Sequence, residues 1–208
     1  MNRTSIVHTE RRNAQNNCSG ASYKEVSMRI IACILLGIAV CAGAHAQSAA
    51  PNRAALFRAA GIVMFNKTLP VADYDFPVTL LEGTTKNLSA YKGNLVLLNF
   101  WASWCGPCRI EMPSMQTLYQ RYKNRPFAFV ALNLGETKET VRRFVDKQKI
   151  NFPVALDEYE EAGFIYGVEA IPTSYLIDRA GNVVGGVQGS IRWDTPAVFA
   201  LFDYLLTE

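Results

Sequence analysis

Histidine is nearly absent from this sequence: there are 2 in 208 residues, His8 and His45, and both lie before residue 47. Cysteine is scarce as well, with 5 residues, of which only Cys105 and Cys108 lie beyond residue 46. A structural zinc site needs Cys and His ligands, and a nucleophilic pair of the Cys-His or Ser-His kind needs an imidazole. If the first 46 residues are removed, the rest of the chain lacks the ligands for such a zinc site and cannot assemble such a pair.

Long apolar runs are also missing, since no apolar stretch comfortably reaches the roughly 20 residues of a membrane-spanning helix. Ile30–Ala44 is uncharged, is interrupted by glycine and leads into the A-x-A pattern Ala44-His45-Ala46. These features are typical of a secretory signal peptide, so we expect one over residues 1–46, cleaved after Ala46. Residues 1–27 are polar, and Met28 is an alternative start. An uncleaved membrane anchor is the alternative interpretation.

Charge of one sign is not in excess once this leader is set aside. The formal net charge of +3 comes from residues 1–46, and the remainder has equal numbers of basic and acidic residues. It contains no basic tract, so we expect no nucleic-acid partner.

Two cysteines so close together serve either redox chemistry or a local structural disulfide. A disulfide loop this small stabilises a fold little.

The remainder is long enough for one domain. We expect residues 47–70 to form a linker and a short amphipathic helix, and residues 71–208 to form the domain. The apolar residues that recur at helical spacing in the first segment are Leu56, Ala60, Val63 and Met64.

Strands and helices alternate in the second segment. An edge hairpin is expected over 76–88, because Pro77 is unsuited to a central strand. The unbroken apolar run Leu95–Trp101 is typical of a strand covered on both faces. A helix with a kink at Pro113 follows over Cys108–Lys123. Its expected inward-facing residues are Ile110, Met115, Leu118 and Tyr122. The later elements are strand 127–134, helix 137–149, strand 152–156, helix 159–166, strands 171–177 and 183–187, and helix 195–206.

The stretch Trp101–Cys108 carries the clearest chemical signal. Two cysteines separated by two residues can close and reopen a small disulfide ring, and a helix N-terminus favours the thiolate that does so. The motif therefore predicts thiol-disulfide exchange. A Cu(I) site with two soft thiolate ligands is the alternative from another class.

Four segments match a known pattern: Asn99–Pro113 with two tryptophans and the C-x-x-C motif, Asn151–Val154, Tyr166–Ser174 with Ile-Pro-Thr, and Ile177–Gly181. On these segments the chain resembles the thioredoxin superfamily, and more narrowly its exported TlpA/ResA-like thiol:disulfide oxidoreductases. The resemblance implies an α/β, thioredoxin-like fold, with a central mixed sheet flanked by helices, an extra N-terminal hairpin and a helix/strand insertion. Peroxiredoxins share this fold, but their Thr three residues before the reactive Cys is Ala102 here, which argues against a peroxidase.

The resemblance also implies a role for each site residue. Cys105 would be the exposed nucleophile and Cys108 the resolving thiol. Pro172 matches the family's cis-proline, placed opposite the cysteines so that the backbone of Ile171 meets the substrate. The residues expected to contact the substrate are Trp104, Gly106, Pro107 and Ile171.

The proton acceptor is expected on the helix. Cytosolic thioredoxin has a buried Asp where this chain has Asn99, which cannot take a proton. Glu111 matches the acidic residue of the ResA-like pattern and would lie about one helical turn from Cys108. We expect it to accept the proton of Cys108, with its pKa raised by partial burial and by the neighbouring thiolates. The alternative is a solvated carboxylate paired with Arg109 or with a more distant basic residue.

As a function, the resemblance implies an exported dithiol reductase of specific protein disulfides, such as apocytochrome c or copper-site cysteines. Its electron donor would be a membrane thiol-transfer protein. The protein would be located in the bacterial periplasm. If the leader is not cleaved and acts as a membrane tether, the protein would instead lie on the periplasmic side of the inner membrane. The Gly-Pro dipeptide favours a reducing potential of about −270 mV. We expect no metal and no cofactor besides the Cys105–Cys108 disulfide. A disulfide oxidant or isomerase of secreted proteins is an alternative function.

Overall fold

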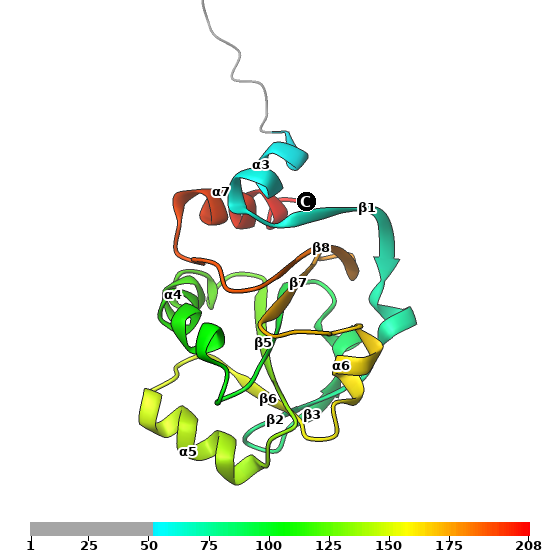
Figure 1. Cartoon of the computed structure of the whole chain (residues 1–208). Coiled ribbons are helices and arrows are strands. Elements are labelled where there is room, and N and C mark those ends of the chain that lie inside the picture. The colour runs from blue at the N-terminus through cyan, green and yellow to red at the C-terminus, as the bar shows by residue number, and fades with distance from the viewer. Residues whose placement is uncertain (1–51) are drawn as a thin grey trace, which may run out of the picture. The chain divides into compact units, whose positions relative to one another are not determined.

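The computed structural model describes residues 52–208 (Figure 1), so the expected signal peptide, its cleavage after Ala46 and the Met28 start lie outside the described residues. The described part contains an 8-stranded mixed sheet with the strand order β1-β8-β7-β4-β5-β6-β2-β3. No helix within residues 52–208 is long and apolar enough to cross a membrane.

Strand β4 (Leu95–Trp101) lies at the centre of the sheet, between the parallel β5 (Phe127–Leu134) and the antiparallel β7 (Thr173–Ile177). All seven of its residues are buried. Leu97 belongs to the hydrophobic core on one face and Leu98 to the core on the other. The prediction of a strand covered on both faces is therefore confirmed.

Helices cover both faces of this sheet. Apolar residues of α3 (Arg53–Ala60), α4 (Gly106–Tyr122), α5 (Lys138–Gln148) and α7 (Pro196–Leu205) share one core with the sheet. The short α6 (Glu161–Ile165) packs on the second core. It is joined there by the 3-10 helices η1 (Val71–Tyr74) and η2 (Leu88–Tyr91). The expected thioredoxin-like arrangement, a mixed sheet flanked by helices, is thus present.

The expected edge hairpin consists of β2 (Pro77–Leu80) and β3 (Thr85–Asn87). Strand β2 also pairs with β6 (Val154–Asp157), which leaves β3 as the outermost strand. Pro77 stands at the first position of β2, where a missing N–H is tolerated.

At the opposite edge, β1 (Val63–Pro70) pairs antiparallel with β8 (Asn182–Gln188). The expected helical stretch ends at Gly61, which has a left-handed backbone with φ 73°, so the helical prediction for Val63 and Met64 is wrong. Glycine in β8 makes the pairing possible, because a Cβ on Gly185 would lie 2.6 Å from the carbonyl oxygen of Val63. The segment predicted as linker and short helix therefore also contains a strand of the sheet.

Helix α4 positions the cysteine motif and begins two residues earlier than expected. Its buried residues include Cys108, Glu111 and Met115, which follow one another at three- and four-residue spacing along one side. Ile110 lies off that side and is 77% exposed, so the expectation that it faces inward is wrong.

Candidate functional site

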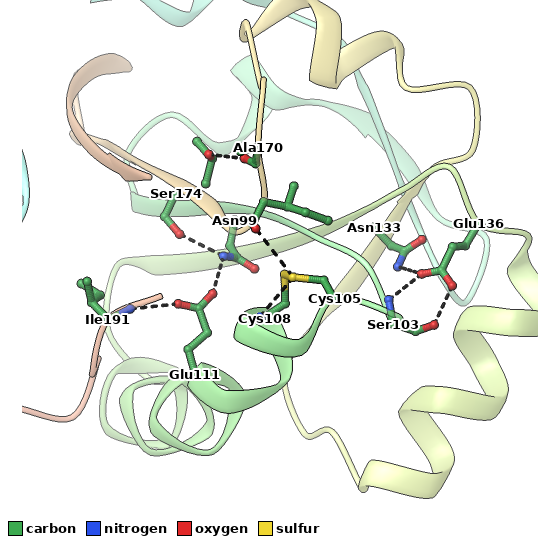
Figure 2. The surroundings of a disulfide bond; sticks show 12 residues. Asn99, Ser103, Cys105, Cys108, Glu111, Asn133, Glu136, Ala170, Ser174 and Ile191 are labelled. Atoms are coloured by element: carbon green, nitrogen blue, oxygen red, sulfur yellow. Dashed lines mark hydrogen bonds between the residues drawn. A yellow bond between two sulfur atoms is a disulfide. The ribbon is translucent and has the colours of Figure 1, made fainter. Parts of the chain in front are cut away.

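The two cysteines stand where β4 gives way to α4 (Figure 2). Cys105 is the N-cap of the helix, and its Sγ accepts a hydrogen bond from the backbone N–H of Cys108 at 3.2 Å. The two residues are joined by a disulfide bond. When this bond opens, the same N–H and the helix dipole stabilise a thiolate on Cys105.

Neither cysteine is exposed in this disulfide form. Cys105 is 4% exposed and Cys108 is 1% exposed, so the expectation of an exposed Cys105 is wrong for this state. The loop before β7 covers the first sulfur, because Cys105 Sγ lies 3.7 Å from the carbonyl oxygen of Ile171. The neighbouring Trp104 is 71% exposed and offers the nearest large apolar surface in the sequence.

The covering loop contains the expected proline. The Ile171–Pro172 peptide bond is cis, and β7 starts at the next residue, Thr173. Thr173 Oγ1 donates to the carbonyl oxygen of Ala170 at 2.7 Å, which closes the turn around the proline. Together these contacts place the backbone of Ile171 next to Cys105.

Glu111 is buried beneath the cysteines, with 2% of its surface exposed. Its Oε1 accepts a hydrogen bond from Asn99 Nδ2 at 3.1 Å, and its Oε2 accepts from Trp193 Nε1 at 3.1 Å and from the backbone N–H of Ile191 at 3.4 Å. Burial raises the pKa of Glu111 to about 7, although these hydrogen bonds oppose the rise. The alternative of a solvated carboxylate paired with Arg109 is therefore wrong.

Asn99 links Glu111 to the strand that follows the cis-proline. Its Nδ2 donates both to Glu111 Oε1 and to Ser174 Oγ, the second at 2.9 Å. These two acceptors fix the amide, and its oxygen points toward the disulfide (Figure 2). Asn99 is thus hydrogen-bonded to Glu111 and presents its amide oxygen on the side of the disulfide.

Glu136 anchors the other side of the motif, and the sequence reasoning missed it. Its carboxylate accepts hydrogen bonds from the backbone N–H and from the hydroxyl of Ser103, each at 2.6 Å, and from Asn133 Nδ2 at 2.8 Å. Ser103 lies two residues before Cys105. The carboxyl ends of the parallel strands β4 and β5 meet at one edge of the sheet, which is the signal that could have placed Glu136 beside the motif.

We expect Glu136→Ala to lower the free energy of unfolding by about 2 kcal/mol, because charge-assisted hydrogen bonds to Ser103 are lost. The loop before Cys105 would also become looser. Urea denaturation measures the first effect and the alkylation rate of reduced Cys105 the second. Glu139→Ala, at an exposed carboxylate on α5, is the matched control. Equal unfolding midpoints for the two variants would contradict this prediction.

Within residues 52–208 there is no group of three or more His, Cys, Asp or Glu side chains placed to hold a metal ion. A Cu(I) site here would have to rely on Cys105 and Cys108. The described residues of this site are therefore arranged around a thiol pair, a buried carboxylate and a proline loop.

Comparison with known proteins agrees with this arrangement. Residues 71–185, more than half of the chain, match the AhpC/TSA family. The thiol-disulfide oxidoreductase ResA of Bacillus thuringiensis subsp. konkukian is 44% identical over 115 residues, which are 55% of this chain and 66% of the relative. The match thus spans slightly less than two thirds of that relative's length.

Solved structures give the same result for the fold. A Chlorobium tepidum protein described as the thiol:disulfide interchange protein DsbE has a TM-score of 0.61 and 34% identity, with 68% of this chain and 99% of that chain covered. StoA from Bacillus subtilis has a TM-score of 0.55 and 28% identity, with 67% and 100% covered. By sequence and by fold, this chain belongs to the thioredoxin-like AhpC/TSA family and is similar to the ResA-type thiol-disulfide oxidoreductases.

Proposed function

We propose that this chain is a thiol:disulfide oxidoreductase, and specifically a dithiol reductase of selected protein disulfides. The observation that carries the proposal is the disulfide at the N-terminus of α4, which faces the Ile171–Pro172 loop and has the buried Glu111 behind it. The names of the ResA and DsbE relatives support the same reaction class.

In the proposed reaction, the reduced protein begins as a dithiol. The Cys105 thiolate attacks one sulfur of the substrate disulfide, and the other substrate sulfur leaves as a thiolate. The Cys108 thiolate then attacks Cys105 Sγ in the mixed disulfide and releases the second substrate sulfur. Two electrons have passed to the substrate, and the protein ends in the disulfide form seen here.

Glu111 is the proposed proton acceptor for the second step. Cys108 must lose its proton before it attacks, and a base works best when its pKa is near the working pH. The pKa of about 7 that burial gives Glu111 meets this condition. The protonated acid is neutral, which suits its buried surroundings.

The proposed substrate surface surrounds the thiol pair. Trp104, Gly106 and Pro107 are exposed beside Cys105, and the backbone of Ile171 could pair with an extended substrate segment. Ile110 adds an exposed apolar side chain on α4. Apocytochrome c or copper-site cysteines as substrates, a membrane thiol-transfer donor and a periplasmic location rest on the family resemblance and are part of the proposal.

The test mixes the reduced, purified protein with a fluorescent peptide disulfide and supplies dithiothreitol as electron donor. We expect repeated turnover by the wild type and a loss of roughly 10³-fold or more in Cys105→Ser, which lacks the nucleophile. Cu(I) titration of the reduced protein runs in parallel. Tight stoichiometric copper binding without turnover would favour the copper site and overturn the proposal.

A redox titration decides the direction of electron flow. A reduction potential of about −270 mV favours a reductase, whereas one of about −120 mV would indicate a disulfide oxidant.

A further inference from the structure

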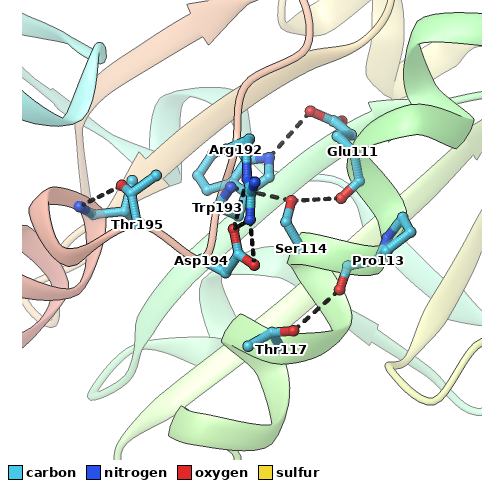
Figure 3. Close-up of polar contacts among 9 residues, drawn as sticks. Glu111, Pro113, Ser114, Thr117, Arg192, Trp193, Asp194 and Thr195 are labelled. Atoms are coloured by element: carbon cyan, nitrogen blue, oxygen red, sulfur yellow. Dashed lines mark hydrogen bonds and ion pairs between the residues drawn. The ribbon is translucent and has the colours of Figure 1, made fainter.

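Residues 189–195, between β8 and α7, fold over the carboxylate of Glu111 (Figure 3). Trp193 in this segment is fully buried. Its indole N–H donates to Glu111 Oε2 at 3.1 Å, and its backbone N–H donates to Ser114 Oγ at 3.1 Å. Ser114 Oγ in turn donates to the carbonyl oxygen of Glu111 at 2.7 Å. Trp193 is therefore hydrogen-bonded to two residues on one turn of α4, Glu111 and Ser114.

Within residues 52–208, every hydrogen-bond partner of the Glu111 carboxylate is a neutral N–H group. Asn99 on β4 donates a hydrogen bond to Oε1, whereas Trp193 and the backbone N–H of Ile191 donate to Oε2. Glu111 makes no ion pair with any residue of the described part of the chain. The charged neighbours of Trp193 in the sequence, Arg192 and Asp194, pair with each other at 2.8 Å. The ionised form of Glu111 therefore depends on these few donors.

The two carboxylate oxygens occupy different surroundings. Oε2 is turned toward the segment with Ile191 and is engaged by two N–H groups, whereas Oε1 lies on the side of Asn99 and the disulfide (Figure 2). A carboxylate oxygen has two lone pairs: both of those on Oε2 accept N–H donors, whereas Oε1 accepts one hydrogen bond and keeps a lone pair free. A proton that arrives from Cys108 would consequently be received on Oε1.

We propose that Trp193 is a positioning residue of the thiol-disulfide site: its indole N–H ties Oε2 of Glu111, so that Oε1, which accepts the single hydrogen bond from Asn99, receives the proton of Cys108. This inference rests on the proposed function of Glu111 as proton acceptor. The proton moves from Cys108 Sγ to Glu111 Oε1, which converts the Cys108 thiol into a thiolate. Trp193 neither gains nor loses a proton in this step.

Among the described residues, few titratable groups lie near Glu111, so its ionisation can be measured separately from theirs. Cys108 lies on its own helix and Cys105 at the start of that helix, and both are held in the disulfide in the form described here. The strands β4 and β7 contribute Asn99 and Ser174, which do not titrate near neutral pH. In the oxidised protein, the ionisation of Glu111 can thus be followed without interference from a nearby thiol.

The experiment measures that ionisation directly, by carbon-13 NMR of the Glu111 side-chain carboxyl carbon in the disulfide form, with Glu111→Gln assigning the signal. We expect Trp193→Phe to raise the midpoint by about one pH unit, a tenfold change in the ionisation constant, because a donor that favours the carboxylate is lost. Ser114→Ala, which keeps the indole N–H but removes the hydrogen bond to the backbone N–H of Trp193, is the matched control and should leave the midpoint within about 0.3 pH unit.

The pH profile of disulfide exchange is the second readout, and Trp193→Phe should move it to higher pH by the same amount. If this variant fails to fold, an analogue of Trp193 with sulfur in place of the indole N–H keeps the ring shape. An unchanged midpoint would overturn the inference whatever the activity. A moved midpoint with an unmoved pH profile would overturn the role in exchange and leave the oxidoreductase assignment intact. A wild type without exchange activity would overturn the proposed function itself.

Discussion

Cys108→Ser is expected to stop the reaction at the mixed disulfide and to leave the substrate covalently attached to Cys105. The serine hydroxyl cannot displace the substrate sulfur, so turnover should fall by roughly 10³-fold or more. Cys105 remains the N-cap of α4, where the helix N-terminus still favours its thiolate. Non-reducing electrophoresis and mass spectrometry of proteins from the native compartment would reveal the attached partners.

The identity of the trapped partners distinguishes the candidate functions. A c-type cytochrome or an oxidase subunit would name the substrate, whereas a broad mixture of secreted proteins would indicate an oxidant or isomerase. The double variant Cys105→Ser, Cys108→Ser is the control, because it lacks both thiols of the motif and should trap nothing through it. Equal adducts in both variants would show that the capture is non-specific.

Glu111→Gln is expected to lower the exchange rate at pH 7 by about 10²-fold and to remove the rise of the rate near that pH, because general base catalysis is lost. Glutamine fits the site. Its side-chain oxygen can accept the hydrogen bond from Trp193 Nε1, and its side-chain N–H group can donate to the oxygen of Asn99 once the Asn99 amide rotates. Stopped-flow measurement of exchange from pH 5 to pH 9 checks the result. An unchanged pH dependence would contradict the assignment of Glu111 as acceptor.

The stability of the same variant gives a reading that does not depend on activity. Burial raises the pKa of Glu111 from 4.5 to about 7, so between these values the folded protein holds a proton that the unfolded chain has lost. The free energy of unfolding of the wild type should therefore fall as the pH rises through this window, by up to about 3 kcal/mol. Glu111→Gln should lack this fall, whereas Glu139→Gln, at an exposed position, should retain it. Urea denaturation at pH 5 and pH 8 measures the difference.

The centre of the fold could be predicted because its signals are local. The uninterrupted apolar run of β4 requires cover on both faces, and the structure provides two cores. Two cysteines directly after such a strand indicate a helix N-terminus, and Cys105 is the N-cap. Glu111 could be placed one turn beyond Cys108, because helical spacing alone sets its side of α4.

Other features depend on contacts between distant parts of the sequence. Nothing local marks Trp193 as a partner of Glu111, since the two are 82 positions apart, and the same holds for Glu136 and Ser103, which are 33 positions apart. Val63 also has an apolar pattern that suits a helix, but Gly61 ends the helix and pairing with β8 decides the conformation. Ile110 was misplaced because the polar Glu111 and Ser114 take inward positions that periodicity assigns to apolar residues.

The pairing of β1 with β8 also sets an order of events during synthesis. In this sheet β1 has β8 as its neighbour, joined through Val63 and Gly186, and β8 is translated after all of the other strands. The first strand of the sheet to be made consequently has no partner strand until the last one has been made. Until then Phe65 and Leu69, which pack on the second core in the finished protein, lack the strand pairing that joins β1 to the sheet.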